Sequence, residues 1–242
     1  MWSYYGSKSK NIKEYPSPKY NLIIEPFAGT ARYSLLYYKN RKIILNDKYK
    51  VITDIWTYLK QASPEQIKNL PELEKGDDLR NFDMLPVERD LMGFMVNRGV
   101  PKPKNIYTNW AASSNEIIRV KQRILDNLDK IRHFVIVNGD YRDLKNVEAT
   151  WFIDPPYQEG GVHYVHNKID YHELGDWCKY RKGQVIVCEN SSASWLNFKP
   201  LVELWGQRKK TKEVIWTKGD KIRSIKPYLH NNTVLYQQTN LF

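Results

Sequence analysis

The sequence predicts an α/β protein built around a doubly wound, mostly parallel sheet of seven strands. Two observations support this fold class. Short apolar runs recur along the chain, and segments with helical periodicity separate most of them, so we expect parallel pairing with helices on both faces. Near the carboxyl end, two further apolar runs are predicted to form a final strand pair.

The first four elements are predicted to alternate between strand and helix. Residues 21–25 (NLIIE) are an apolar run that Pro26 ends, because proline has no amide hydrogen for a sheet. Residues 31–40 (ARYSLLYYKN) predict a helix that closes with an asparagine. The second strand and the second helix are predicted at 42–46 and 51–62.

After a long interruption the alternation resumes. The third and fourth strands are predicted at 133–140 and 150–154. A helix over 170–180 begins with a capping-box pattern, in which Asp170 is followed three positions later by Glu173. The remaining strands are predicted at 184–190, 212–217 and 232–239.

Residues 63–132 form the interruption. The segment contains a helix start at Ser63-Pro64-Glu65 and an amphipathic helix expected over Ile117–Ile131. At about seventy residues it is too long for a plain crossover between strands. We therefore predict one domain formed by residues 1–62 and 133–242, with a mainly helical domain inserted at 63–132.

Composition and charge restrict the class of protein. Of the 242 residues, 41% are hydrophobic, and no apolar run approaches the length of a membrane span, so no membrane partner is expected. The formal net charge of +11 favours a polyanionic partner. Many of the cations lie between Lys199 and Lys226, where phosphate contact and a solvated basic face are both open. Two cysteines and no recognisable secretory signal indicate a reducing, cytoplasmic location.

All five strands of the predicted parallel part end in polar residues. In such a sheet, ligands bind beyond the carboxyl ends of the strands. The strand ends are Glu25, Asn46-Asp47, Gly139-Asp140, Asp154 and Glu189-Asn190. This pattern predicts a binding site along one edge of the sheet.

The turn EPFAGT, residues 25–30, connects a strand to a helix through the single glycine Gly29. Asp47 follows that glycine by about twenty residues, the spacing at which an acid binds ribose hydroxyls in nucleoside-binding sheets. Ala31 stands where the dinucleotide pattern GxGxxG has its second glycine, which disfavours a pyrophosphate. A ligand with a ribose, no phosphate and a cation facing Glu25 fits better, and S-adenosylmethionine (SAM) has these features.

The stretch IDPPYQ, residues 153–158, ends the fourth predicted strand with a carboxylate and two prolines. The exocyclic amine of a nucleobase is a weak nucleophile, because its lone pair is delocalised into the ring. Asp154 and the carbonyl of Pro155 can accept the two amine hydrogens, and Tyr157 offers a face for stacking. The prolines hold the two acceptors in place. The motif therefore predicts alkylation of a nucleobase amine.

These motifs occur in the order typical of the Dam-like adenine-specific DNA methyltransferases, which the chain resembles over most of its length. The stretch YYGSK at residues 4–8 is similar to the amino-terminal motif of that family, and EPFAGT is similar to its cofactor loop. Asp154-Pro-Pro-Tyr157 is its catalytic motif. The insertion lies where the family carries its target-recognition domain, and Ala31 departs from a frequent glycine of the family.

The resemblance implies an enzyme that methylates the N6 amine of an adenine flipped out of duplex DNA. The implied catalytic residues are Asp154, Pro155, Pro156 and Tyr157. The implied SAM-binding residues are Tyr4, Lys8, Glu25, Phe27, Ala28, Gly29, Asp47, Asp140, Tyr141 and Asp154. We expect the loop from Arg98 to Trp110 to read bases, and the basic carboxyl-terminal stretch to contact phosphates.

Other functions stay open at the level of sequence. They are methylation of cytosine N4, methylation of adenine in RNA, and binding of SAM and DNA without methyl transfer. No metal is expected, because the loop with His163 and His166 lacks a cysteine or a fixed fourth ligand. We expect a monomer, with a weak dimer as the alternative, in the cytoplasm of a bacterial cell or a phage-infected host.

Overall fold

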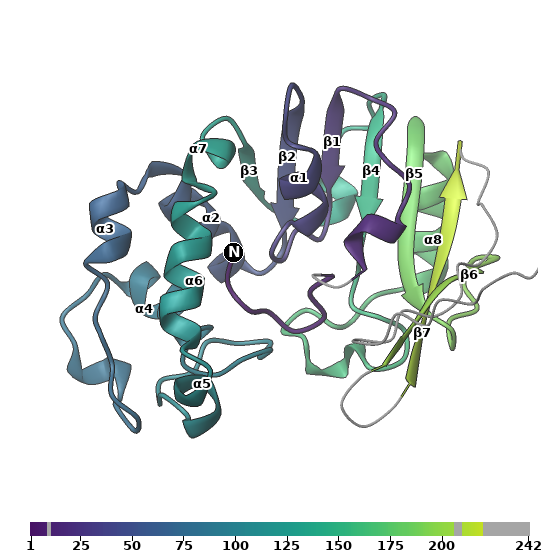
Figure 1. Ribbon diagram of the computed structural model, residues 1–242. Helices are drawn as coiled ribbons and strands as arrows, with labels where there is room; N and C mark the ends of the chain where they lie inside the picture. The colour runs from purple at the N-terminus through teal and green to yellow at the C-terminus, as the bar shows by residue number, and fades with distance from the viewer. Residues whose placement is uncertain (9–10, 206–209, 220–242) are drawn as a thin grey trace, which may run out of the picture.

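A computed structural model describes residues 1–8, 11–205 and 210–219. Its centre is a seven-stranded sheet with the strand order β3-β2-β1-β4-β5-β7-β6 (Figure 1). The strands are β1 (Leu22–Glu25), β2 (Lys42–Asp47), β3 (Val135–Asn138), β4 (Ala149–Ile153), β5 (Gly183–Asn190), β6 (Lys199–Trp205) and β7 (Lys210–Lys218). Strands β3, β2, β1, β4 and β5 are parallel, whereas β7 runs antiparallel to β5 and β6. The predicted seven-stranded, mostly parallel sheet is confirmed.

Strand β7 covers the predicted 212–217 and pairs with β5 on one side and, from Lys210 to Ile215, with β6 on the other. The strand predicted over residues 232–239 lies outside the described part of the chain. Strand β6 was not predicted because Pro200 breaks its apolar pattern, and a proline is tolerated there because β6 is an edge strand. Its register shifts between Pro200 and Val202.

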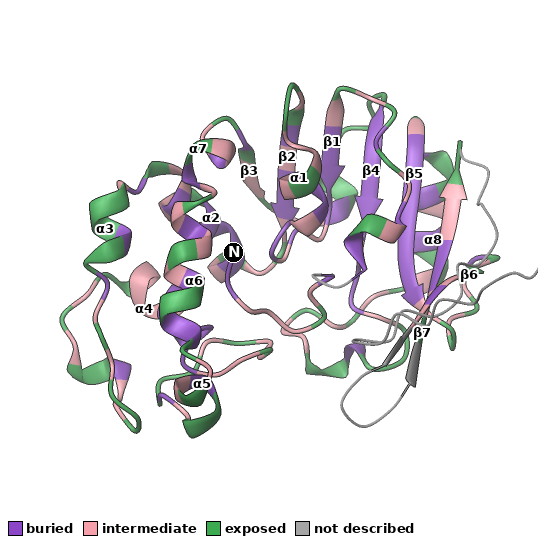
Figure 2. Ribbon diagram, viewed as in Figure 1, coloured by how far each residue is buried: buried purple, intermediate pink, exposed green. Residues whose placement is uncertain are grey.

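Side chains of β4 alternate between two hydrophobic clusters, one on each face of the sheet. Trp151 and Ile153 pack in one cluster with Leu174 of α8 (Tyr171–Tyr180). Phe152 points to the other face, where its ring stacks on Tyr33 of α1 (Arg32–Tyr37) at a centroid distance of 4.2 Å. Figure 2 shows the central strands buried along most of their length. Helices therefore cover both faces, as predicted.

The remaining helices lie mostly between β2 and β3 in the chain. They are α2 (Lys50–Gln61), α3 (Pro64–Lys68), α4 (Pro86–Gly93), α5 (Asn109–Ser113), α6 (Glu116–Leu125), α7 (Leu128–Ile131) and the 3-10 turns η1 (Ile12–Glu14), η2 (Leu79–Asn81), η3 (Tyr141–Asp143) and η4 (Gly161–His163). The single helix predicted over 117–131 is instead the pair α6 and α7. The side-chain amide of Asn127 donates to the Arg123 carbonyl at 2.6 Å, which ends α6.

The inserted segment lies beside β3, and its regular elements are the helices α3 to α7 and the turn η2 (Figure 1). It shares a continuous hydrophobic cluster with α2, so it is not packed around a separate core. Its role as a recognition domain stays a prediction. In the described ranges, no helix has the length and apolar character needed to cross a membrane.

Candidate active site

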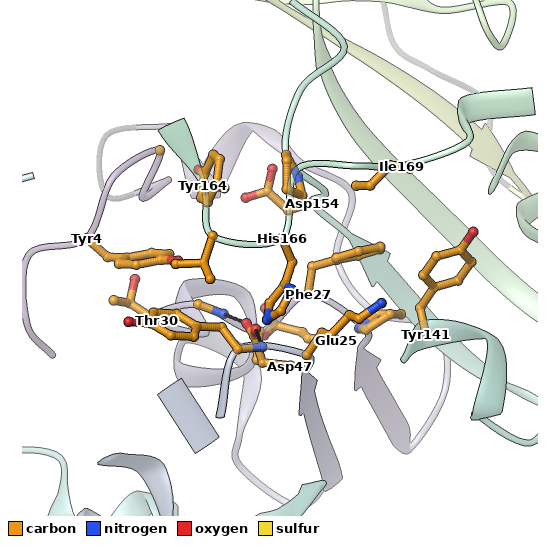
Figure 3. A pocket seen from close by; sticks show the side chains of 18 of the residues that line it. Tyr4, Glu25, Phe27, Thr30, Asp47, Tyr141, Asp154, Tyr164, His166 and Ile169 are labelled. Atoms are coloured by element: carbon orange, nitrogen blue, oxygen red, sulfur yellow. Dashed lines mark hydrogen bonds between the residues drawn. The ribbon is translucent and has the colours of Figure 1, made fainter. Parts of the chain in front are cut away.

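A pocket of about 270 Å³ lies at the carboxyl ends of β1, β2 and β4. The strand order reverses between β1 and β4, and such a point leaves a crevice at the edge of the sheet. Figure 3 shows Tyr4 and Tyr164 at one end of the pocket and Tyr141 and Ile169 at the other. Lining residues come from segments 4–8, 25–32, 47–49, 140–142, 152–156 and 164–173. Every predicted SAM-binding residue lines this single pocket, although binding itself stays a prediction.

Hydrogen bonds join the glycine turn after β1 to strand β2. The backbone amide of Ala28 donates to the backbone carbonyl of Asn46 at 2.9 Å, and the side-chain amide of Asn46 donates to the Pro26 carbonyl at 2.9 Å. Gly29 and Ala31 both adopt a φ of +45°, a left-handed conformation that costs a non-glycine residue roughly 1–2 kcal/mol. At Ala31 a glycine would therefore be favoured by backbone conformation.

Asp47 ties this turn to β2 through both carboxylate oxygens. Oδ2 accepts from the Gly29 amide at 3.0 Å, and Oδ1 accepts from the Tyr49 amide at 2.9 Å. Burial raises the pKa of Asp47 to about 6, against these two hydrogen bonds, which lower it. Each oxygen keeps a lone pair, so the carboxylate can still accept from a hydroxyl in the pocket.

Glu25 is a buried carboxylate at the end of β1. Its side chain accepts from the Ser34 amide in α1 at 2.7 Å, and no described cation forms an ion pair with it. Burial raises the pKa of Glu25 to about 8, with a smaller contribution from Asp154. A positively charged ligand in the pocket would stabilise the ionised form and lower this pKa.

We expect the stability of the ligand-free protein to fall as pH rises from about 4.5 towards about 8. In this range the folded state keeps a proton on Glu25 that the unfolded state has lost. The free energy of unfolding therefore decreases by up to about 1.4 kcal/mol per pH unit. Urea denaturation at several pH values should show this slope, reduced in Glu25→Gln. Equal slopes in the two proteins would contradict the assignment of the buried charge to Glu25.

Aromatic and apolar side chains form the opposite end of the pocket. The rings of Phe27 and Tyr141 lie 5.3 Å apart, and Tyr141 contacts Trp177 edge-on at 5.1 Å. Ile169 adds an aliphatic side chain, which sequence reasoning did not single out. This end can take a flat, apolar ring.

Asp140 lies on the rim of the pocket and already pairs with two cations. Arg142 donates to its carboxylate from Nε at 2.8 Å and from Nη2 at 3.0 Å, and the Lys48 ammonium lies at 2.9 Å. The Arg142 hydrogen bond and Lys48 hold the pKa of Asp140 well below its ordinary value. A ligand that binds Asp140 must therefore share it with two cations.

The carboxylate of Asp154 forms an ion pair with Lys8. The resemblance had implied that Lys8 binds the cofactor. Lys8 Nζ lies 3.1 Å from Asp154 Oδ1 and 3.5 Å from Glu213 Oε2, and it also donates to the Tyr157 hydroxyl. The ammonium lies 4.4 Å from the centre of the Tyr157 ring. The Tyr157 hydroxyl in turn donates to Glu213 at 2.7 Å, and the Tyr15 hydroxyl does so at 3.2 Å.

Two carboxylates thus share one buried ammonium. Burial raises the pKa of Asp154, and Glu213 adds to this rise, whereas Lys8 opposes it. Burial lowers the pKa of Lys8, but Asp154 and Glu213 outweigh it and the net shift is upward. Lys8 is therefore a protonated cation that favours the ionised form of Asp154.

Glu189, at the end of β5, fixes the turn that follows Asp154. Its Oε2 accepts from the Gln158 amide at 3.0 Å and from the Trp195 indole at 3.2 Å. Burial raises the pKa of Glu189 to about 6. The Tyr171 hydroxyl also donates to the Pro156 carbonyl at 2.8 Å. The sequence indicated Glu189 only as a polar strand end, and its partners could not be found from spacing.

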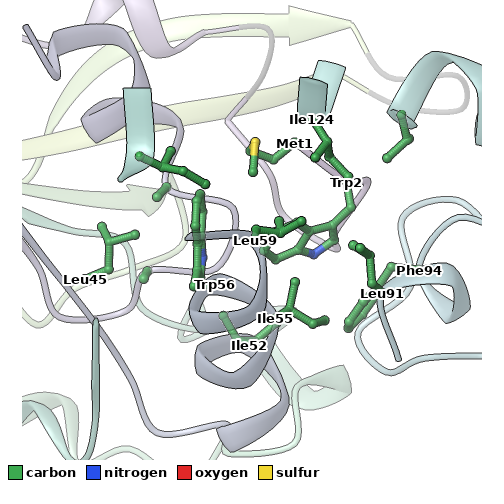
Figure 4. Packing of buried hydrophobic residues seen from close by; sticks show 14 of the residues in the cluster. Met1, Trp2, Leu45, Ile52, Ile55, Trp56, Leu59, Leu91, Phe94 and Ile124 are labelled. Atoms are coloured by element: carbon green, nitrogen blue, oxygen red, sulfur yellow. The ribbon is translucent and has the colours of Figure 1, made fainter. Parts of the chain in front are cut away.

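The amino-terminal segment enters the site because Trp2 anchors it in the core. The Trp2 side chain is fully buried and lies 5.3 Å from Trp56 of α2 and 6.4 Å from Phe94, measured between ring centres (Figure 4). Residues 4–8 then run along the pocket and bring Lys8 to Asp154.

The segment after the Asp-Pro-Pro-Tyr motif covers this amino-terminal segment. The Tyr164 hydroxyl donates to the Tyr5 carbonyl at 2.9 Å, and its ring meets that of Tyr4 at 5.9 Å. Gly6 has a φ of +73°, and a Cβ there would meet the Tyr164 hydroxyl, so glycine is favoured at this position. Sequence reasoning missed Tyr164, because its contacts join residues about 160 positions apart.

No protein-family model and no curated protein matches this sequence. Among solved structures, the chain is similar to one described as "Putative methyltransferase yhhF from Escherichia coli", with 9% identity and a TM-score of 0.33 over 80% of this chain and 75% of that one. A conserved hypothetical protein of Streptococcus pyogenes also has 9% identity and a TM-score of 0.33, over 85% and 90% of the two chains. Likenesses of this degree do not identify a function.

Proposed function

We propose that the protein transfers the methyl group of SAM to the exocyclic N6 amine of an adenine in DNA. The observation that carries the proposal is that Asp154 lines the same pocket as Glu25 and Asp47. A carboxylate suited to a nucleobase amine therefore shares one cavity with carboxylates suited to a cation and a ribose. The choice of adenine in DNA rests on the resemblance of the Asp-Pro-Pro-Tyr motif.

The chemistry of the pocket fits SAM. Glu25 is a buried carboxylate without a described cationic partner, and the sulfonium and ammonium of SAM are cations. Asp47 can accept from ribose hydroxyls, and Phe27 and Tyr141 offer apolar faces to an adenine. When bound, SAM supplies a methyl group made electrophilic by its positively charged sulfur.

The residues of the motif are suited to activate an amine. Asp154 and the Pro155 carbonyl can accept the two amine hydrogens, which favours a tetrahedral nitrogen with a free lone pair. In the described part of the chain no donor reaches the Pro155 carbonyl, whereas Tyr171 holds the Pro156 carbonyl. The Pro155 carbonyl can thus accept from a substrate, and the Pro156 carbonyl fixes the turn.

A target base would have to displace Lys8. The Lys8 ammonium contacts Asp154 and lies over the face of Tyr157, which are the two places assigned to the amine and the ring of the base. Glu213 lies 3.5 Å from the same nitrogen, so Lys8 keeps an anionic partner when Asp154 turns to the substrate.

Transfer of tritiated methyl groups from SAM to duplex DNA tests the proposed activity. Duplex DNA of mixed sequence should acquire label, and heat-denatured protein should give none. Label on RNA but not on DNA would indicate the RNA alternative. Binding of SAM and DNA with no transfer to either would leave only a binding protein.

Replacing Asp47 should weaken the binding of SAM. We expect Asp47→Ala to lose about 1.5–3 kcal/mol of binding free energy, the contribution of a hydrogen bond to a charged group. Isothermal calorimetry with SAM measures this loss. Asp54→Ala is the matched control, because Asp54 is half exposed on α2 and pairs with Lys50 away from the pocket. Unchanged affinity in folded Asp47→Ala would place the ribose elsewhere.

A further inference from the structure

A second cavity, of about 370 Å³, lies on the other side of the amino-terminal segment from residue 3 to residue 8. The insertion forms its opposite wall through Arg98, Gly99, Glu116 and Arg123. Arg32, Lys8 and Glu213 complete the charged part of the lining. Lys8 borders both cavities, so this one adjoins the place assigned to the target amine.

The charges around the second cavity are not balanced. Its lining includes four cations, Lys8, Arg32, Arg98 and Arg123, and two carboxylates, Glu116 and Glu213. Of the cations, Lys8 also pairs with Asp154 outside this lining. The hydroxyls of Tyr15 and Tyr157 already donate to Glu213, and the Lys8 ammonium pairs with it. Glu116 is buried and must serve both Arg98 and Arg123, each at 3.2 Å.

In the described part of the chain, two donors around this cavity lack a hydrogen-bond acceptor. They are Nε of Arg123 and the side-chain amide of Asn11, both buried, with Asn11 only 2% exposed. Among the described residues, Arg32 makes only long hydrogen bonds, at 3.3 Å to Ser7 and 3.5 Å to the Trp2 carbonyl. Burial and the nearby Arg123 lower the pKa of Arg32 to about 10. Uncompensated cations and unused buried donors together indicate an anionic ligand.

An exposed aromatic ring lies beside the same arginines. The Arg98 guanidinium lies 4.9 Å from the ring centre of Trp110, and Trp110 is 51% exposed. The sequence suggested that the loop holding these residues reads DNA, and the structure brings its two ends together. A guanidinium stacked on an exposed indole is suited to a nucleic-acid strand, because such a surface serves both phosphate and base.

We propose that this second cavity binds a backbone phosphate of the DNA strand that carries the target nucleotide, through Arg32, Arg98 and Arg123. The inference rests on the proposed function, because it takes DNA as the substrate. It assigns phosphate recognition to the junction between the sheet domain and the insertion. Of the basic stretch from Lys199 to Lys226, predicted for that role, residues 206–209 and 220–226 lie outside the described part of the chain.

Binding of a mixed-sequence DNA duplex, measured between about 50 and about 200 mM NaCl, tests this proposal. Arg98→Gln and Arg123→Gln should each weaken binding and reduce the slope of log affinity against log salt by about one. Arg32→Gln, which breaks no ion pair with a carboxylate, should act in the same direction. Lys39→Gln is the control. Lys39 is exposed and precedes β2, so it lies at the end of the sheet opposite the carboxyl ends of the strands.

Calorimetry with SAM shows whether the Arg98 and Arg123 variants keep their fold, since neither residue lines the cofactor pocket. Wild-type DNA binding with a salt slope that none of the three variants changes would overturn the phosphate site and leave the proposed activity intact. A wild-type protein that binds no DNA, or that prefers an RNA duplex, would overturn both.

Discussion

Asp154→Ala should lower the rate of methyl transfer by about 100- to 1000-fold or more. The substitution removes an acceptor that orients the target amine, and the Pro155 carbonyl alone cannot hold both hydrogens. It also leaves Lys8 with Glu213 and Tyr157, so the ammonium stays where the base would stack. Initial rates of tritium transfer to duplex DNA, with SAM held saturating, measure the effect.

Two comparisons make the Asp154 result specific. Asp176→Ala removes an exposed carboxylate on α8 that pairs with Lys179, and it should keep the wild-type rate. Calorimetry with SAM separates lost cofactor binding from lost transfer. An Asp154→Ala protein that keeps more than about a tenth of the wild-type rate would be incompatible with the assigned role.

Lys8→Met should shift the pH dependence of transfer. Asp154 acts as an acceptor when ionised, so activity rises with pH through its pKa. Burial and Glu213 raise that pKa, and Lys8 is the cation that opposes them. Removing a cation within about 4–6 Å should move the acidic limb of the profile upward by about 1 to 3 pH units. At pH values below this acidic limb, the activity of Lys8→Met should be about 10- to 1000-fold lower than that of the wild type.

The shape of the profile distinguishes this effect from a structural one. A variant that is merely misfolded would lose activity at every pH, whereas Lys8→Met should recover at alkaline pH. Lys48→Met is the control, because Lys48 pairs with Asp140 on the rim and does not contact Asp154. An acidic limb that stays in place in Lys8→Met would refute the role given to Lys8.

The sequence was informative where a few neighbouring residues determine the structure. The turn from Glu25 to Thr30, Asp47 at the end of β2 and Asp154 at the end of β4 were all found, because strand ends in a parallel sheet gather at one edge. Asp170 likewise caps α8 as predicted, accepting from the amides of His172 and Glu173.

The missed features depend on contacts between distant residues. Lys8 meets Asp154 because Trp2 is buried next to α2, and no local pattern indicates that path. Glu213 lies within the basic stretch from Lys199 to Lys226, and no local pattern indicates that β7 carries it to the Tyr157 hydroxyl. Strand β6 was missed because Pro200 obscures its pattern, and Asn127 divides a helix that periodicity alone predicts as continuous.

The identity of the methylated nucleoside tests the central claim most directly. Duplex DNA would be incubated with the protein and SAM, digested to nucleosides, and separated by chromatography with mass detection. Our account predicts N6-methyldeoxyadenosine with the wild-type protein and a near-complete loss of it with Asp154→Ala. N4-methyldeoxycytidine as the product, or no methylated nucleoside from a protein that binds SAM, would contradict it.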